Sequence, residues 1–277
     1  MNKKKINSKR IVLKILYWLA VAIVVAAVLI PLWYMFTSSL KRIVDLMNPE
    51  RIFLFQPIVD NYVNVFVDYN FARPIWNSLV IGAVSTALAC LLGLPAAYSI
   101  ARYKKRKVAF VVLSVRIIPG IMFLIPWYII FARLGLIGSF TSMILAHLLI
   151  SLPLIVWIVT PYFESIPKEL EEAAFIDGSS VFRSFIQIML PLSKPGIFTA
   201  SILAFIFSWN NFMFALVLTG RRTRTLPMAI FNFMSDIAVD WAGLMAAGVI
   251  ITAPVIIIAI LLQKYVVSGL TAGAVKG

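Results

Sequence analysis

The chain has 277 residues, of which 62% are hydrophobic and 13% charged, and its formal net charge is +14. Soluble domains contain about 45–50% apolar residues, so this excess indicates a protein that lies in the bilayer. The basic residues flank apolar runs and are not interleaved with stacking aromatic side chains, which argues against a nucleic-acid partner. Cys90 is the only cysteine and His147 the only histidine. Neither an intrachain disulfide nor a structural metal site, which needs about four ligands, is therefore expected.

Apolar stretches long enough to cross a bilayer recur along the chain, and prolines inside several of them favour a bundle in which neighbouring helices satisfy the freed carbonyls. The first stretch follows a basic N-terminus but is too long for the core of a signal peptide, so a retained helix is expected. The sequence thus predicts a single all-α transmembrane domain over 1–277 with six transmembrane helices. The expected spans are 12–36, 75–98, 108–131, 139–161, 196–219 and 243–266.

Lys and Arg are distributed unevenly between the segments that join these spans. With the N-terminus in the cytoplasm, sixteen of them fall in cytoplasmic segments and eight in outside segments. Cytoplasmic segments carry the excess of positive charge, so both termini are expected inside. The cluster Arg221–Arg224 opposes this rule. With Asp236 and Asp240 it lies in an outside segment, where it either contacts a soluble partner or is a solvated turn.

The longest cytoplasmic segment, about 162–195, carries the most specific pattern. Pro167 is suited to the first turn of a helix, with carboxylates near its N-terminal end, and Gly178 can end that helix or turn the chain. Apolar residues at helical spacing over 181–189 predict a second short helix. Such a pair exposes apolar side chains beside carboxylates and is suited to docking in a groove of a soluble partner. The alternative is a solvated or lipid-skimming loop.

Six short segments of the sequence form a recognisable set. They are Glu172-Ala173-Ala174, Asp177-Gly178-Ser179, Ile188 with Leu190-Pro191, Ser208-Trp209-Asn210-Asn211-Phe212, Ala215–Thr219 and the tail Ser268–Gly277. The first three resemble the EAA loop of the permeases of ATP-binding-cassette (ABC) importers. The others resemble the binding-protein-dependent sugar importers, and within them the MalG-like permeases of the maltose type. Asn211 departs from this pattern, because many relatives have an acidic residue there.

The resemblance implies a type I importer in the bacterial inner membrane. In such a machine this chain pairs with a second, MalF-like permease, an ATPase dimer holds ATP and Mg, and an extracytoplasmic binding protein delivers a sugar, expected to be an oligosaccharide. This chain itself would bind no cofactor and catalyse no reaction. The coupling element implied by the resemblance consists of Glu172, Ala173, Ala174, Asp177 and Gly178, and the tail residues that would reach the ATPases are Gly269, Thr271, Gly273 and Lys276.

Two absences from the sequence support that division of labour. No Gly-Lys dipeptide occurs, so the chain has no phosphate-binding loop of the Walker A type. No Asp or Glu lies well inside an expected span, which weakens the alternative of an ion-coupled carrier. A membrane enzyme is a further alternative, and one His with one Cys cannot supply most catalytic sets. The same importer architecture for glycerol phosphate or a polyamine also stays open.

Polar residues inside the expected spans are candidates for the translocation path. Trp209, Asn210 and Asn211 could contact sugar hydroxyls or form hydrogen bonds between helices. Arg116 is the only charge well inside a span, and it either snorkels to the interface or lines the path. His147 is expected to bond between helices, with substrate binding as the alternative.

Overall fold

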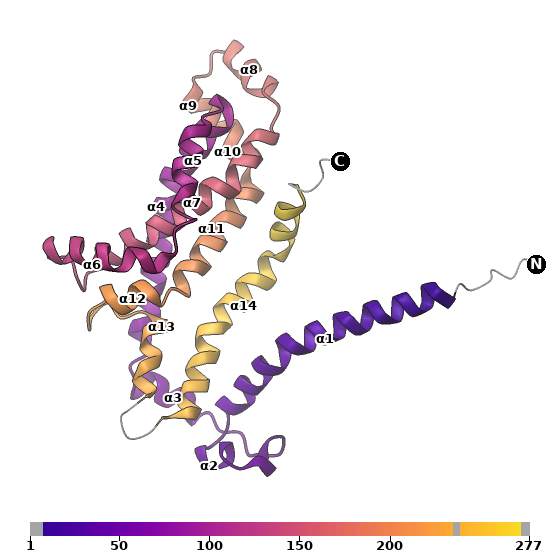
Figure 1. The fold of residues 1–277 in the computed structure, drawn as a ribbon, viewed down its shortest axis with the longest axis vertical. Helices are drawn as coiled ribbons and strands as arrows, with labels where there is room; N and C mark the ends of the chain where they lie inside the picture. The colour runs from indigo at the N-terminus through magenta and orange to yellow at the C-terminus, as the bar shows by residue number, and fades with distance from the viewer. Residues whose placement is uncertain (1–7, 235–238, 273–277) are drawn as a thin grey trace, which may run out of the picture. The chain divides into compact units, whose positions relative to one another are not determined.

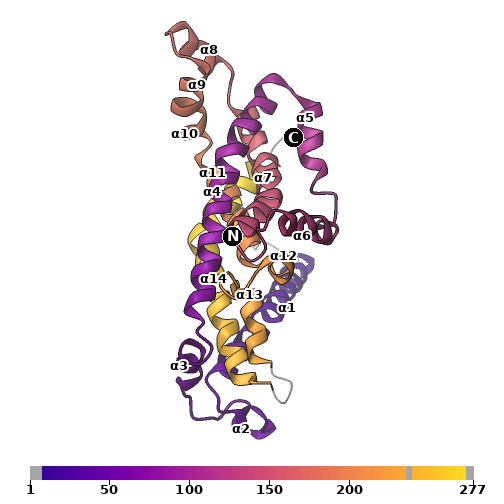
Figure 2. The same ribbon diagram turned by 90° about the vertical axis from the view of Figure 1, so that its left-hand side faces the viewer.

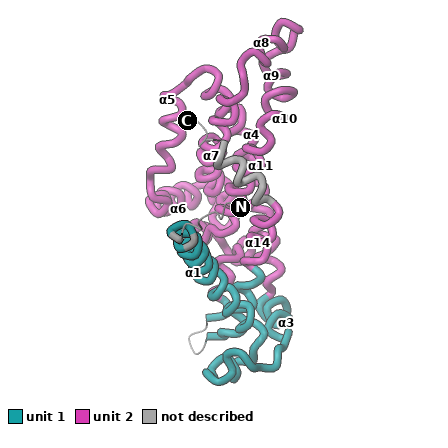
Figure 3. The backbone as a smooth tube through the Cα atoms, turned by 90° about the vertical axis from the view of Figure 1, so that its right-hand side faces the viewer, with its two compact units in different colours: residues 1–69, 232–250 teal, residues 70–231, 251–277 magenta. Residues whose placement is uncertain are grey.

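The computed structural model describes residues 8–234 and 239–272, which are predominantly helical. Within these ranges the strand-like pairing is an isolated bridge between Met234 and Val239. The chain divides into two compact units (Figure 3). Unit 1 comprises residues 1–69 and 232–250, and unit 2 comprises residues 70–231 and 251–277. The expected all-α class is confirmed.

Unit 1 contains the long first helix and the segment that follows it. Lys41 is buried there, and its Nζ donates to the Ile52 carbonyl at 2.8 Å and lies 4.7 Å from the Phe55 ring centroid. Asn61 Nδ2 donates to the carbonyls of Ser39 and Lys41 at 2.8 and 2.9 Å, so polar contacts order this segment. The helices of unit 1 are α1 (Ser8–Ser39), α2 (Ile43–Leu46), the 3-10 turn η1 (Pro49–Arg51), α3 (Asp60–Val67) and the first turns of α14 (Trp241–Ala272).

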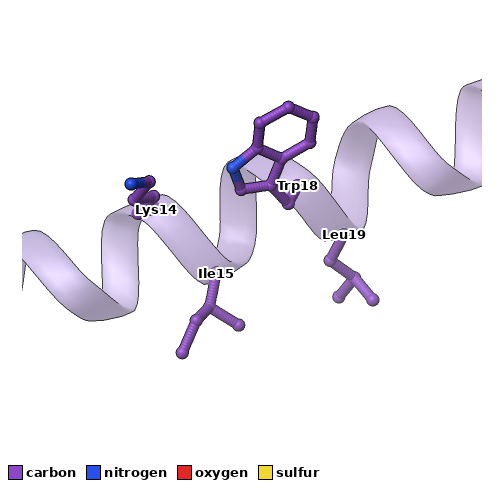
Figure 4. A pocket seen from close by; sticks show the side chains of 4 residues that line it. All are labelled: Lys14, Ile15, Trp18 and Leu19. Atoms are coloured by element: carbon purple, nitrogen blue, oxygen red, sulfur yellow. The ribbon is translucent and has the colours of Figure 1, made fainter.

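Helix α1 is apolar on all sides, and none of its best spanning window is buried within the chain. Lys14, Ile15, Trp18 and Leu19 line a shallow hollow, and Figure 4 shows that all four side chains come from this one helix. A lysine beside a tryptophan is typical of the membrane–water interface, where a charged head stays in water and an amphipathic ring sits at headgroup level.

Unit 2 is built around three helices that lie side by side in Figures 1 and 2, namely α4 (Ala72–Tyr103), α7 (Phe140–Ser165) and α11 (Lys194–Trp209). Small residues allow the close approach: a Cβ on Gly93 of α4 would lie 3.1 Å from Ile155 Cγ2 of α7. The other elements are α5 (Arg106–Ser114), η2 (Gly120–Phe123), α6 (Leu124–Arg133), α8 (Glu169–Ile176), α9 (Val181–Ser184), the π-helix η3 (Phe185–Met189), α10 (Leu190–Leu192), α12 (Met213–Leu218), α13 (Leu226–Ala229), η4 (Ile230–Phe233), which crosses the unit boundary, and the rest of α14.

Four of the expected spans correspond to helices that are long and apolar enough to cross a bilayer. A fifth crossing would join Val181–Leu192 to Lys194–Trp209, although the two segments are bent by 79°. The six-span arrangement in a membrane stays a prediction. The four helices are Val12–Ser39, Ala72–Tyr103, Phe140–Ser165 and Trp241–Leu261.

The two other expected spans are not continuous helices. The stretch 108–131 consists of α5, a turn, η2 and α6, because Pro119 has no N–H and restricts the residue before it, and Gly120 begins the 3-10 turn. The stretch 196–219 breaks after Trp209 at Asn210 and Asn211 and resumes as α12.

Candidate functional site

The expected helix–turn–helix is present at one end of unit 2, where α8 and α9 project beyond the ends of α4 and α7 (Figures 1 and 2). Glu169, Glu171 and Glu172 occupy the first turn of α8, where the helix dipole favours negative charge. Gly178 has φ +83°, a conformation that favours glycine, and it turns the chain as the sequence predicts. Ser180 then caps α9, because its side chain accepts the Arg183 N–H at 3.2 Å.

The surface of this element combines apolar side chains with free carboxylates. Ile176 is 87% exposed and Phe182 71% exposed. Glu172 and Asp177 are also exposed. We call this surface, formed by Glu172, Ala173, Ala174, Ile176, Asp177, Gly178 and Phe182, the docking face. Exposed apolar side chains on a helix with nothing packed over them are suited to insertion in a groove of another protein.

Glu171 behaves differently from its neighbour Glu172, because it is buried and only 4% exposed. Its Oε2 forms an ion pair with Arg102 Nε, and its Oε1 accepts the Tyr98 hydroxyl at 2.6 Å. Tyr98 and Arg102 are four residues apart in the last turns of α4, so both project from one face of that helix. A single carboxylate of α8 is therefore held by two side chains of α4.

Arg102 also joins two further segments. Its Nη1 donates to the Ile166 carbonyl at 3.1 Å, just beyond α7, and its Nη2 lies 3.3 Å from Met189 Sδ in η3. The ring of Tyr98 packs against Phe163 and Phe185, with centroids 6.0 and 5.1 Å away. The sequence did not reveal this cluster. Nothing in the sequence distinguishes Glu171 from the adjacent Glu172. Arg102 lies in a run of basic residues that the sequence explains by membrane orientation alone.

A cavity of about 600 Å³ lies beside this cluster, at the ends of α4 and α7. It is lined by basic and acidic side chains together with backbone, so it has no single charge character. The charged residues that line it are Arg102, Lys104, Arg106, Lys168, Glu164 and Glu169.

The candidate path residues of α11 lie at a helix end. Trp209 is buried, and its Nε1 donates to the Ile251 carbonyl at 3.1 Å. Asn211 Oδ1 accepts the Phe214 N–H at 3.0 Å and so caps α12, whereas Asn210 is exposed. The placement of these amides in mid-helix was wrong, because the helix breaks where their side chains can compete for backbone hydrogen bonds.

His147 of α7 lies next to this break and forms the expected hydrogen bond between helices. Its Nδ1 is 2.5 Å from Ser208 Oγ on α11, and its Nε2 is buried without a hydrogen-bond partner. Together with Ser151 and Asn211, these two residues line a cavity of about 30 Å³, which is room for about one water molecule. No group of three or more possible metal ligands occurs in the described part of the chain.

Arg116 lies in the turn after α5, outside any helix, so its expected place inside a continuous span was wrong. Its guanidinium carbon is 4.9 Å from the centroid of Trp157 on α7. Of the tail residues, Gly269 and Thr271 continue α14 in their backbone, and Gly273 and Lys276 lie outside the described residues.

The basic cluster Arg221–Arg224 is fixed to the start of α4. Asn77 Nδ2 donates to the carbonyls of Arg222 and Arg224 at 3.0 and 2.8 Å. Asp240 belongs to unit 1, where its Oδ2 accepts the Tyr69 hydroxyl at 3.2 Å, and Asp236 lies outside the described residues.

Known proteins resemble this chain in sequence and in fold. It is 36% identical to the trehalose/maltose transport system permease protein MalG of Thermococcus litoralis, covering 93% of this chain and 97% of that protein. It is 35% identical to the trehalose transport system permease protein SugB of Mycobacterium tuberculosis, covering 94% and 97%. A solved bacterial ABC transporter involved in the import of the acidic polysaccharide alginate contains a chain with the same fold, with a TM-score of 0.80 at 21% identity over 95% of this chain and 99% of that one.

The family model described as "Binding-protein-dependent transport system inner membrane component" matches residues 89–272, a stretch that includes the docking face, the buried cluster at Glu171 and the break at Asn210. The chain therefore belongs to the family of inner-membrane components of binding-protein-dependent transport systems.

Proposed function

We propose that this chain is one of two permease subunits in an ABC importer that moves a sugar into the cell, with an oligosaccharide as the cargo class. Two relatives that match nearly the whole chain are named for trehalose and for trehalose/maltose transport, which supports a disaccharide as the first cargo to test. The second permease, of a MalF-like type, and an extracytoplasmic binding protein complete the path from outside.

The docking face carries this proposal. It combines the exposed apolar side chains of Ile176 and Phe182 with the exposed carboxylates of Glu172 and Asp177, and it contains the motif Glu172-Ala173-Ala174. A helical element of this kind is suited to the cleft of a separate ATPase, which would hold ATP and Mg, so this chain would need no cofactor and perform no catalysis. Closure of an ATPase dimer would move both docked helices together and open the path to the outside.

Orientation follows from where the basic residues lie. Lys104–Lys107 follow α4 at the same end of unit 2 as α8, and the positive-inside rule places such a cluster in the cytoplasm. An ATPase docking on α8 must approach from that side as well. Both termini of the chain would then be cytoplasmic, and the tail from Gly269 to Lys276 would reach toward the ATPases.

Trp209, Asn210, Asn211 and Arg116 stay candidates for the path. Asn210 is the exposed amide at the break between α11 and α12, and Arg116 is exposed against Trp157. Amide, guanidinium and aromatic groups are the types that bind sugar hydroxyls and ring faces. These four would act with side chains of the second permease.

The test is to purify the tagged chain with its native neighbours and to measure ATP hydrolysis in lipid, with binding protein and either trehalose or maltose. A co-purifying ATPase and hydrolysis stimulated by one of these sugars support the proposal. Glu172→Ala should remove most of the stimulation. Glu169→Ala, which removes an exposed carboxylate three residues earlier on α8, should retain it. A chain that purifies alone and transports without ATP would refute the importer function. Stimulation by glycerol phosphate or a polyamine alone would refute only the sugar.

A further inference from the structure

Helix α8 is tied to the rest of the chain by one buried side chain. Glu171 is the only residue of α8 that is buried, while its neighbours Glu169, Leu170 and Glu172 are exposed. Covalently, α8 is attached through Ile166 and Pro167 at one end and through the glycine turn at Gly178 at the other. Such connections permit a short helix to swing, so a force applied to the docking face needs another route to the membrane helices.

We infer that the Arg102–Glu171 pair is that route, and that it makes α8 and α4 move as one body when the docked ATPase changes state. This inference rests on the proposed function. Arg102 and Tyr98 grip both oxygens of one carboxylate, and Arg102 also binds the end of α7 and contacts η3. The Arg102 guanidinium of α4 thus contacts α8, the residue after α7, and η3. A guanidinium is always charged and forms hydrogen bonds in fixed directions.

The energetics favour a positioning role over simple stabilisation. Replacing a buried ion pair with apolar residues of similar size is often neutral or stabilising, whereas removing one partner alone leaves an uncompensated buried charge and is strongly destabilising. Burial of apolar surface is non-directional, so an apolar contact at this place would hold α8 near α4 without fixing its orientation. A charged pair at this point is therefore suited to passing a movement of α8 to α4 while keeping the orientation of α8 fixed.

The direct test measures whether α8 and α4 move together. Spin labels on Glu169→Cys of α8 and Leu91→Cys of α4, both at exposed positions, would be introduced with Cys90→Ser into the complex with its ATPases. In the otherwise native chain, the distance between the labels should be the same without nucleotide and with ATP and Mg. In the double variant Glu171→Leu/Arg102→Met, addition of ATP and Mg should shift or broaden the distance.

Three further variants separate positioning from folding. Glu171→Gln keeps the acceptor for Tyr98 and loses the charge, so it should assemble and show a partial shift. Arg102→Met alone should assemble poorly, and Arg102→Lys should restore assembly with an intermediate shift. Sugar uptake per ATP hydrolysed should fall in the same order as the distance shift grows.

Several results would overturn the inference. One is a label distance that changes with ATP in the native chain, and another is a double variant whose distance and uptake per ATP match the native complex. Failure of every variant to assemble would assign the pair to folding alone. If no ATPase co-purifies with the unmutated chain, the proposed function itself fails, which is a separate outcome.

Discussion

Gly196 offers the sharpest test of the packing in unit 2. It lies in the first turn of α11, and a Cβ at this position would lie 2.5 Å from Cγ and 2.6 Å from Cε2 of Tyr162 on α7. Ordinary contacts of a Cβ begin at about 3.4 Å, and Cγ is too close to the α7 backbone to move without a rotamer change or a separation of the helices. Overpacking of this kind costs about 1–3 kcal/mol. Gly196→Ala should therefore lower the unfolding temperature of the purified complex.

The assay is thermal unfolding in detergent, read as the temperature at which half of the complex has aggregated. Gly120→Ala is the matched control, because the nearest atom to its Cβ would be Met213 Sδ at 3.9 Å, and it should unfold close to the native temperature. Tyr162→Ala combined with Gly196→Ala should recover part of the loss, since the clash is removed. Equal unfolding temperatures for Gly196→Ala and the native chain would show that α7 and α11 are not this close.

Three further outcomes are expected. The Cβ added by Gly178→Ala would meet open space, but the alanine must adopt φ +83°, which costs about 1–2 kcal/mol. This variant should therefore weaken co-purification of the ATPase, and an unchanged yield of ATPase would contradict the turn geometry. Trp209→Phe removes the bond to the Ile251 carbonyl and should destabilise the complex by about 1 kcal/mol in a denaturant or thermal assay, and no loss would exclude that bond. Burial, and secondarily the negative charge of Asp240, raise the pKa of Tyr69. The neutral phenol therefore contributes its full stability below about pH 10, the ordinary pKa of tyrosine. That stability is lost as the pH rises through the raised pKa of the folded state. Tyr69→Phe should flatten this alkaline loss of unfolding temperature, and an identical pH profile would argue against the contact.

Hydrophobic length predicted four of the long helices well, because a run of apolar residues has few other stable forms in a bilayer. The breaks in the other two depend on local chemistry. Pro119 followed by Gly120 interrupts one stretch, and the amides of Asn210 and Asn211 interrupt the other. These residues were visible in the sequence, yet proline inside α7 and α14 leaves those helices continuous. A single proline removes one backbone hydrogen bond and can be tolerated inside a helix, whereas Pro119 stands directly before Gly120, which has a low helix propensity.

The helix–turn–helix of the candidate site could be predicted because its signals are local. Gly178 ends α8 and Ser180 begins α9 through their own backbone and side-chain geometry. The second helix differs in that Phe185–Met189 is a π-helix. Pro191 has no N–H for the Gln187 carbonyl, so a regular α-helical ladder cannot continue there. The Glu171 contact could not be predicted, because it joins residues far apart in the chain.

The attachment of α8 through a single buried residue also gives it value as a reporter. Lys168 and Arg183 flank the docking face and are exposed in the isolated chain, so trypsin has access to the peptide bonds on both sides of it. An ATPase seated on the docking face would shield these bonds. The rate at which trypsin releases the fragment between them would then measure subunit occupancy in native membranes, without a label, a mutation or knowledge of the cargo.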